Sequence, residues 1–392
     1  MIALKAARTL VDGHARDDAY VTIDRDHIAD VSDRALPGAS VVALPGLDLI
    51  PGLVDLHSDC LEERAHPRPG REQPLAAALL QLDAEAAAHG ITTHYLCATI
   101  EDDPLQHRST QRAAQTVHCL HDLREQLLAD HRVHLRVELT SDAEELAREL
   151  AALDVVGLIS YMHHTPGHGQ FAADPDAWRS IYANGFTGSD AELQELLADR
   201  QRRATHADHR RDQVAAIARD TDTPLASHDD ARDEDTRIAA GLGGRICEFP
   251  LNRDAAAAAR RNGLGVVMGA PNAWRGGSHL GGLAARDVLA DGHLTALASD
   301  YHPPALLAAA YALAADGVAT WADAVALVTT NPATLAGLHD RGSIAAGRRA
   351  DLIAVATVAG HPVVRGVWRA GTPILRAATA QPNSPTLDPT GP

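Results

Sequence analysis

Eight short apolar runs, each followed by a polar loop and a helical pattern, alternate along this chain between residues 49 and 340. Parallel strands that are buried on both faces give continuous apolar runs of this kind. Eight such repeats favour an α/β fold, a (β/α)8 TIM barrel. A doubly wound open sheet is the alternative, but no GxGxxG sequence follows the first run. The runs are 49–56, 91–98, 134–139, 155–162, 223–227, 245–249, 265–268 and 294–299.

The two ends of the chain have a different character. Short alternating strands separated by turns precede the first barrel run, and strand character returns at residues 342–344 and 351–356. We therefore expect residues 1–50 and 340–378 to form one small β-sandwich domain beside a barrel that spans residues 51–339.

Two segments depart from the strand-helix alternation. Residues 168–212 contain Trp178, Tyr182 and a helical pattern, and they are too long for an ordinary barrel loop. We expect them to form a lid over the site. Residues 379–392 are rich in Pro, Thr and Ser and are expected to be a disordered tail.

Composition excludes several classes of function. With 35 basic and 52 acidic residues among 392, the formal charge is −17, which argues against a general nucleic-acid binder. The chain has no apolar stretch of the ~20 residues that span a bilayer and no signal peptide, so we expect a cytoplasmic protein without a membrane partner. Self-association stays open. Four scattered cysteines without a CxxC pair exclude a cysteine zinc knuckle.

Candidate metal ligands stand where the predicted strands end, which is where barrel active sites are built. A histidine alone at one such end would mean little, but six of the eight ends carry His, Asp or Glu. This mixed nitrogen and oxygen set suits one or two divalent ions, with Zn²⁺ as the leading candidate and Mn²⁺ or Fe²⁺ as alternatives. The strand-end residues are His57 with Asp59, Glu138, His163 with His164, His228 with Asp229 and Asp230, Glu248, and Asp300 with His302.

Several motifs resemble known families. The segments 51–59 (PGLVDLHSD) and 347–352 (GRRADL), with the aspartate after the last strand, resemble the amidohydrolase superfamily of metal-dependent hydrolases on a distorted (β/α)8 barrel. Further segments resemble, within it, the PhnM-like diphosphatase family of phosphonate metabolism. They are LE (61–62), PRP (67–69), HTPG (164–167), QF (170–171), PLASHDD (224–230), EFP (248–250), MGAPN (268–272), RGGSH (275–279) and SDY (299–301).

The resemblance implies a diphosphatase that converts α-D-ribose 1-methylphosphonate 5-triphosphate to the 5-phosphate and pyrophosphate. It also implies the ligands His57, Asp59, His164, His228 and Asp300. Many superfamily members bridge two metals with a carboxylated lysine, but Lys5 is the only lysine here. We therefore predict that a carboxylate bridges, choosing Glu138 with Glu248 as the alternative, and that Asp300 is also the catalytic proton acceptor. The chain departs from the family pattern at Cys60, usually Asn, and at His163, usually Asp.

A polyanionic substrate needs local arginines, because the whole chain is acidic. We expect Arg68, between two prolines, and Arg275 to bind phosphate, although both would be solvated if the adjoining glycines merely make a turn. The other enzymatic hypothesis is hydrolysis of a cyclic amide or deamination of a nucleobase-like compound, and a non-catalytic binding protein is the third. The predicted substrate-binding residues around Arg275 are Gly276, Gly277, Ser278 and His279.

Overall fold

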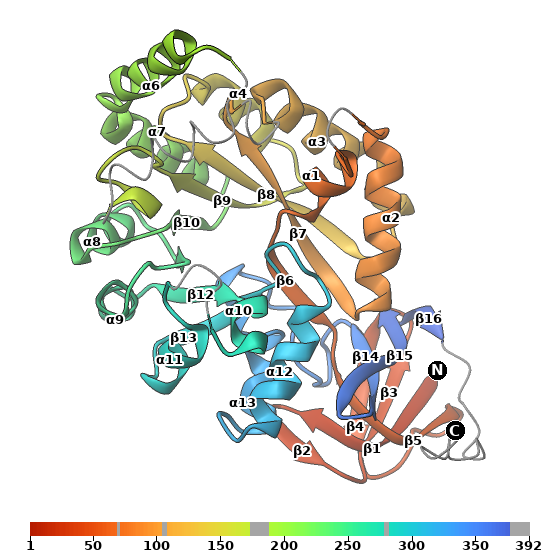
Figure 1. Ribbon diagram of the computed structural model, residues 1–392. Helices are drawn as coiled ribbons and strands as arrows, with labels where there is room; N and C mark the ends of the chain where they lie inside the picture. The colour runs from red at the N-terminus through yellow and green to blue at the C-terminus, as the bar shows by residue number, and fades with distance from the viewer. Residues whose placement is uncertain (69–70, 104–107, 173–187, 278–281, 377–392) are drawn as a thin grey trace, which may run out of the picture.

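The computed structural model describes residues 1–68, 71–103, 108–172, 188–277 and 282–376. Within them eight parallel strands pair in chain order, each beside the next, which confirms the predicted barrel and excludes a doubly wound sheet (Figure 1). The strands are β6 (Leu53–Ser58), β7 (Ile91–Ile100), β8 (Asp130–Glu138), β9 (Val156–Met162), β10 (Leu225–His228), β11 (Ile246–Glu248), β12 (Gly265–Gly269) and β13 (Leu294–Ala298).

The first and last strands close the barrel indirectly. At the carboxyl ends, a single β-bridge joins Ser58 to Asp300. In addition, the amides of Leu297 in β13 and Val54 in β6 donate to the backbone carbonyls of Leu327 and Val328, at 2.9 and 3.0 Å. The barrel is therefore nearly closed, and β6 and β13 are joined by a single bridge instead of a ladder.

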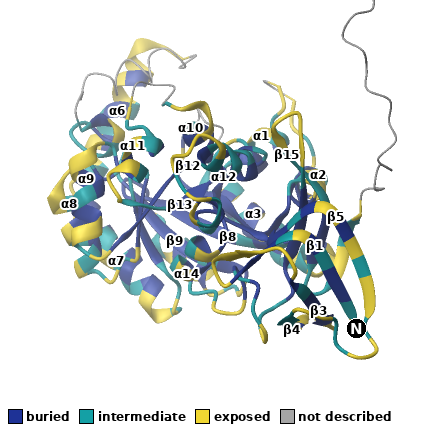
Figure 2. Ribbon diagram, turned by 90° about the horizontal axis from the view of Figure 1, so that it is seen from below, coloured by how far each residue is buried: buried dark blue, intermediate teal, exposed yellow. Residues whose placement is uncertain are grey.

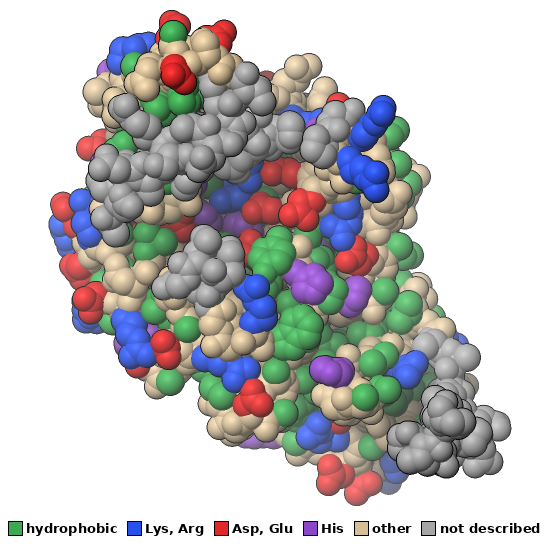
Figure 3. All heavy atoms as spheres, in the orientation of Figure 1, with side chains coloured by type: hydrophobic (Ala, Val, Ile, Leu, Met, Phe, Trp, Pro, Cys, Tyr) green, Lys and Arg blue, Asp and Glu red, His purple; other side chains and the backbone are tan. Residues whose placement is uncertain are grey.

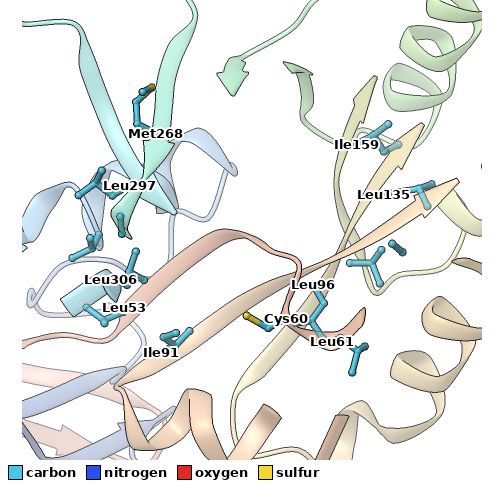
Figure 4. Close-up of a cluster of buried hydrophobic side chains, with 14 of the residues drawn as sticks. Leu53, Cys60, Leu61, Ile91, Leu96, Leu135, Ile159, Met268, Leu297 and Leu306 are labelled. Carbon is cyan, nitrogen blue, oxygen red and sulfur yellow. The ribbon is translucent and has the colours of Figure 1, made fainter. Parts of the chain in front are cut away.

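The strands are apolar because both of their faces are covered. All ten residues of β7 are buried, and Figure 2 shows dark blue strands inside helices whose outer faces are yellow. One hydrophobic cluster fills the space between strands and helices and includes Leu53, Leu96 and Leu135 (Figure 4). A smaller cluster, with Val54 and Tyr95, fills the barrel interior.

Helices cover the barrel from outside. α9 shows why: Ala255, Ala256, Ala258 and Ala259 are buried on one side, and the Asn252 side chain accepts a hydrogen bond from the Ala255 amide at 2.8 Å to start the helix. The helices are α1 (Cys60–Ala65), α2 (Leu75–Ala88), α3 (Thr110–Leu123), α4 (Glu144–Ala151), α6 (Asp190–Ala204), α7 (Ala207–Asp220), α8 (Asp233–Gly241), α9 (Arg253–Arg261), α10 (Ala270–Arg275), α11 (Ala285–Ala290), α12 (Ala305–Ala315), α13 (Trp321–Ala326) and α14 (Thr330–Leu335), with short 3-10 turns η1 (Arg124–Gln126) and η2 (Gly169–Phe171).

Both ends of the chain contribute to a second sheet, as predicted. Its strands pair in the order β16-β15-β14-β5-β1-β3-β4, with β2 on β1, so they form one continuous mixed sheet. The ends meet where β5 pairs antiparallel with β14. The strands are β1 (Ile2–Val11), β2 (His14–Arg16), β3 (Tyr20–Asp24), β4 (His27–Ser32), β5 (Ser40–Pro51), β14 (Leu352–Val358), β15 (His361–Arg369) and β16 (Thr372–Arg376).

Two strand predictions were wrong in detail. The run 49–56 is two strands, because β5 ends at Pro51 in the second sheet and β6 begins at Leu53 in the barrel. Gly52 separates them where a Cβ would lie 2.2 Å from Thr92 Oγ1. Residues 342–344 form no strand; Ile344 is apolar because its side chain is buried in the core of the second sheet.

The 168–212 segment holds η2, α6 and the start of α7. Because α7 packs against α4 and β9, it is the outer barrel helix that follows β9. α6 is held to the barrel by buried Arg200, whose guanidinium donates to Glu101 at 2.5 Å. Trp178 and Tyr182 lie outside the described residues, so a lid function stays a prediction.

Two further predictions were a disordered tail and the absence of a membrane-spanning segment. The predicted tail, 379–392, also lies outside the described residues. Among the helices that are described, none has the length and apolar character needed to cross a bilayer.

Candidate metal centre

Charged and imidazole side chains from six strands meet at the carboxyl ends of the barrel. Parallel strands in a closed barrel bring these ends to one rim, which explains why residues far apart in the chain become neighbours. Figure 3 shows histidine, carboxylate and basic side chains gathered in a hollow of this face. They include His57, Asp59, His134, Arg136, Glu138, His164, His228, Asp229, Glu248 and Asp300.

Glu248, fully buried at the end of β11, lies among three imidazoles. Its Oε1 is 3.3 Å from His57 Nδ1, and its Oε2 is 3.5 Å from both His134 Nε2 and His228 Nδ1. Burial opposes ionisation, but the neighbouring His134 and His57 hold the pKa of Glu248 well below its usual range. An ionised carboxylate therefore stands at the centre of the imidazole cluster.

His164 is held between two carboxylates. Its Nδ1 lies 3.1 Å from Glu138 Oε2 and its Nε2 lies 3.2 Å from Asp229 Oδ2. Glu138 Oε1 in turn accepts from the Thr140 amide at 3.2 Å. Burial lowers the pKa of His164, but its hydrogen bonds to Asp229 and Glu138 raise it to about 10. Without a metal, His164 is therefore protonated at neutral pH.

Arg136 joins the two sides of the cluster. Its Nη1 donates to Asp59 Oδ1 at 3.1 Å, and its Nη2 lies 3.0 Å from His228 Nε2. A guanidinium can only donate, so His228 Nε2 accepts and the ring proton sits on Nδ1, facing Glu248. Burial opposes ionisation of Asp59, but Arg136 and His57 hold its pKa well below the usual range.

The backbone is strained at three of the strand ends. Asp229, Phe249 and Asp300 follow β10, β11 and β13 with φ of 58°, 51° and 60°, in the left-handed region that non-glycine residues avoid. The amide of Asp300 donates to the His57 carbonyl and its carbonyl accepts from the Asp59 amide, both at 2.9 Å. Such strain is concentrated at functional sites, where surrounding contacts maintain it.

The donor set fits a metal ion. Glu248 Oε2 and His228 Nδ1 are buried 3.5 Å apart without a well-oriented hydrogen bond, and such unsatisfied polar atoms are expected where an ion can bind. Four groups of side chains among the described residues have ligand atoms within 4.8 Å of one another. They are His57, Cys97 and His134; His57, His228 and Glu248; His164, His228 and Asp229; and His57, Asp59 and Asp300.

The structure brings most of the predicted ligands into these groups. Glu138 is the exception, because its oxygens are directed at Thr140 and His164. Glu248, the alternative bridging carboxylate, contacts imidazoles from three strands. Glu248 thus contacts three of the clustered imidazoles, whereas Glu138 contacts His164 alone among them. The predicted ligands within the groups are His57, Asp59, His164, His228 and Asp300.

The predicted substrate-binding arginines are exposed, and among the hydrogen bonds and ion pairs of the described residues neither contacts a candidate ligand. Arg68 is exposed between α1 and α2, and Arg275 is exposed at the end of α10, where its Nε donates to a backbone carbonyl of that helix at 3.3 Å. Gly276, with φ of 79°, ends α10, and the amides of Gly276 and Gly277 both donate to the Asn272 carbonyl. These two amides therefore close the helix. The remaining two predicted residues, Ser278 and His279, lie outside the described residues.

The two departures from the family pattern have structural explanations. Cys60 is buried with its Sγ 3.8 Å from the Asp300 carbonyl, and burial raises the pKa of its thiol to about 12. His163 stacks on His168 with ring centroids 4.0 Å apart, and its Nε2 lies 2.8 Å from the Thr165 hydroxyl oxygen. His163 is therefore turned toward a pocket of about 250 Å³ that opens beside His228.

Sequence reasoning missed Arg136, His134 and Cys97 and did not select Asp229. A signal for two of them existed: His134, Arg136 and Glu138 alternate along β8, so they share one face of the strand. No sequence pattern identifies Cys97, because a cysteine within an apolar run is normally assigned to the hydrophobic core.

Comparisons with known proteins agree with this geometry. The model of the amidohydrolase family matches residues 66–375. The chain is 37% identical over 329 residues to the alpha-D-ribose 1-methylphosphonate 5-triphosphate diphosphatase of Escherichia coli (strain K12), covering 82% of this chain and 87% of that protein.

Solved structures support the fold. N-acetyl-D-glucosamine-6-phosphate deacetylase from Mycobacterium smegmatis superposes with a TM-score of 0.62 at 16% identity, covering 96% of this chain and 100% of that one. Dihydropyrimidinase from Brevibacillus agri NCHU1002 superposes with a TM-score of 0.63 at 14% identity, covering 96% and 95%. At these identities the likeness concerns architecture alone.

Proposed function

Because this chain belongs to the amidohydrolase family, we propose that it is a metal-dependent diphosphatase acting on a ribose triphosphate that carries a phosphonate. The proposed substrate is α-D-ribose 1-methylphosphonate 5-triphosphate, and water cleaves it to the 5-phosphate and pyrophosphate. The observation that carries the proposal is the buried Glu248, which contacts three imidazoles at the barrel mouth. The relative in E. coli supplies the substrate class.

The centre would hold one or two divalent ions, with Zn²⁺ as the leading candidate and Mn²⁺ or Fe²⁺ as alternatives. A bound divalent ion lowers the pKa of water toward ~7 and polarises a phosphoryl oxygen. Glu248 lies between the two sides of the centre and is the bridging carboxylate of this proposal. The other ligands are His57, Asp59, His164, His228, Asp229 and Asp300.

Asp300 is the proposed catalytic proton acceptor. It lies in one group with His57 and Asp59. Burial raises the pKa of Asp300 above its ordinary value, which makes its carboxylate a better base than an exposed aspartate. The backbone hydrogen bonds that join it to His57 on β6 and to Asp59 just after β6 fix its position. The carboxylate would take a proton from the attacking water and pass it to the group that leaves when the bond between the α- and β-phosphates is cleaved.

Anion recognition requires cations close to the centre, since the chain carries a net charge of −17. Arg275 and Arg68 are proposed to bind the outer phosphates, with Ser278 and His279 adding donors. Their exposure suits residues that meet a ligand arriving from solvent. We further propose a small anionic molecule as the only substrate class, with no nucleic-acid or membrane partner and a cytoplasmic location.

Pyrophosphate release tests the function. The purified protein, freed of metal with a chelator and reloaded with Zn²⁺, Mn²⁺ or Fe²⁺, is incubated with the triphosphate, and products are followed by phosphorus NMR. We expect equal amounts of pyrophosphate and the 5-phosphate. Release of orthophosphate alone, or turnover of a cyclic amide without turnover of the triphosphate, would contradict the proposal. Metal-free protein is the matched control.

A further inference from the structure

A buried guanidinium lies inside the set of candidate ligands. The Arg136 side chain is 5% exposed, and its two terminal nitrogens lie 3.1 Å from Asp59 Oδ1 and 3.0 Å from His228 Nε2. Its Nε is buried without a hydrogen-bond partner among the described residues. Arg136 thus reaches into the centre and touches two candidate ligands from different strands.

Both contacted side chains are candidate ligands, and His228 Nε2, the atom that faces Arg136, also lies 3.9 Å from Asp229 Oδ2 of the same ligand group. Asp59 belongs to one metal-capable group and His228 to two others. A metal binds a histidine nitrogen through its lone pair at ~2.0–2.1 Å. On His228 Nε2 that lone pair already accepts the guanidinium hydrogen, and one lone pair cannot serve both partners.

We propose that Arg136 is the resident cation of the metal-free centre and that it competes with a divalent metal for Asp59 and His228. This inference rests on the proposed metal dependence of the site. It assigns Arg136 a role opposite to that of a residue that orients ligands for the metal.

The charges of the centre also predict that Arg136 weakens metal binding. Without a metal, the clustered carboxylates, of which Glu138 and Glu248 are fully buried, need a cation, and Arg136 supplies one. With a metal, the same guanidinium adds repulsion and leaves Asp59 and His228 to the ion. The carboxylates concerned are Asp59, Glu138, Asp229, Glu248 and Asp300.

The test compares the metal affinity of the Arg136→Met variant with that of the wild type. Methionine keeps an apolar side chain of similar length but carries no charge. Metal-free protein is titrated with Zn²⁺ or Mn²⁺ against a chromophoric chelator, with no substrate present. We expect affinity to rise by at least about tenfold, because two charge-assisted hydrogen bonds no longer compete. Metal-free Arg136→Met should also unfold at a lower temperature, and metal should restore the loss.

Two variants serve as controls. Arg108→Met removes a partly buried guanidinium that pairs with Glu62 at 3.1 Å and, among the described residues, forms no hydrogen bond or ion pair with a candidate ligand, so its metal affinity should change less than about threefold. Arg136→Lys keeps the charge but cannot span both contacts, so its affinity should lie between wild type and Arg136→Met. If Arg136→Met does not fold without metal, the test rests on Arg136→Lys, whose metal affinity should likewise exceed that of the wild type.

Unchanged or weaker metal binding by Arg136→Met and Arg136→Lys would overturn the proposal. A residue that orients ligands predicts that outcome, with a loss of ~10–100-fold. Because this experiment contains no triphosphate, its outcome is independent of pyrophosphate release. Failure of the competition and failure of the diphosphatase activity are therefore distinguishable.

Discussion

Replacing Glu248 with Gln tests which carboxylate organises the centre. The substitution keeps the size of the side chain but removes its charge, in a fully buried position that faces His57, His134 and His228. Glu138→Gln is the matched control, because Glu138 is equally buried yet contacts only His164 among the imidazoles.

The contacts set the expected magnitudes. A residue that only orients a ligand costs ~10–100-fold in metal affinity when it is lost, which we expect for Glu138→Gln. Loss of a charged bridging ligand should cost more than this range, so Glu248→Gln should retain little metal after dialysis. In metal-free protein, breaking a buried charge pair costs ~3–5 kcal/mol of unfolding free energy, and Glu248→Gln should approach that range.

Two measurements check the prediction. Metal content is determined by elemental analysis after dialysis against buffered free metal, and the unfolding free energy of metal-free protein by urea titration. Far-ultraviolet circular dichroism confirms that both variants are folded. A greater loss of metal in Glu138→Gln than in Glu248→Gln would refute the assignment of the bridge and return it to Glu138.

Four further outcomes are expected. His164 has a pKa of about 10 in the metal-free protein, so a metal must displace its proton. Apparent metal affinity measured by titration should therefore rise about tenfold per pH unit, for each displaced proton, up to pH 10. The His164→Gln variant should show a weaker dependence of metal affinity on pH. Asp300→Asn should lower turnover by a factor on the order of 10² or more, and unchanged turnover would remove Asp300 from the mechanism. Arg275→Ala should raise KM for the triphosphate roughly 10- to 150-fold with unchanged metal content; normal kinetics would show that Arg275 is merely solvated. Gly52→Ala should destabilise the protein in urea by at least ~1–3 kcal/mol, because the added Cβ would lie 2.2 Å from Thr92 Oγ1, and a neutral effect would contradict the packing argument.

The barrel was predictable because strands that are buried on both faces have continuous apolar sequences. Each strand carries an apolar run, and the runs recur with helices between them. The passage from one sheet to the other was not predictable in the same way. Leu49 and Leu53 are both fully buried, so hydrophobicity does not change where β5 ends and β6 begins. Only Gly52 marks the place, and a single glycine is a weak signal.

The candidate site was predictable as far as it consists of strand ends. Position along the chain indicated which carboxylates reach the rim, but Glu138 and Glu248 both end strands. Their different contacts depend on where the neighbouring His164 and His57 project, which sequence does not show. Arg136 was not predicted for another reason. Arginine is rarely buried, so an arginine in a sequence is normally assigned to the protein surface.

The protonation of the centre bears on how metal enters. In metal-free protein His164 has a pKa of about 10, and despite burial the carboxylates of Glu248 and Asp59 raise the pKa of His57 well above its ordinary value. With Arg136, these imidazolium groups supply the positive charge that the carboxylates require. The backbone bonds of Asp300 to β6 hold the rim without involving any ligand atom. On the proposal that Arg136 competes with metal, the centre would assemble before metal arrives, and metal binding would exchange protons and a guanidinium for an ion within a folded barrel, unlike small metal domains that fold only with their ion.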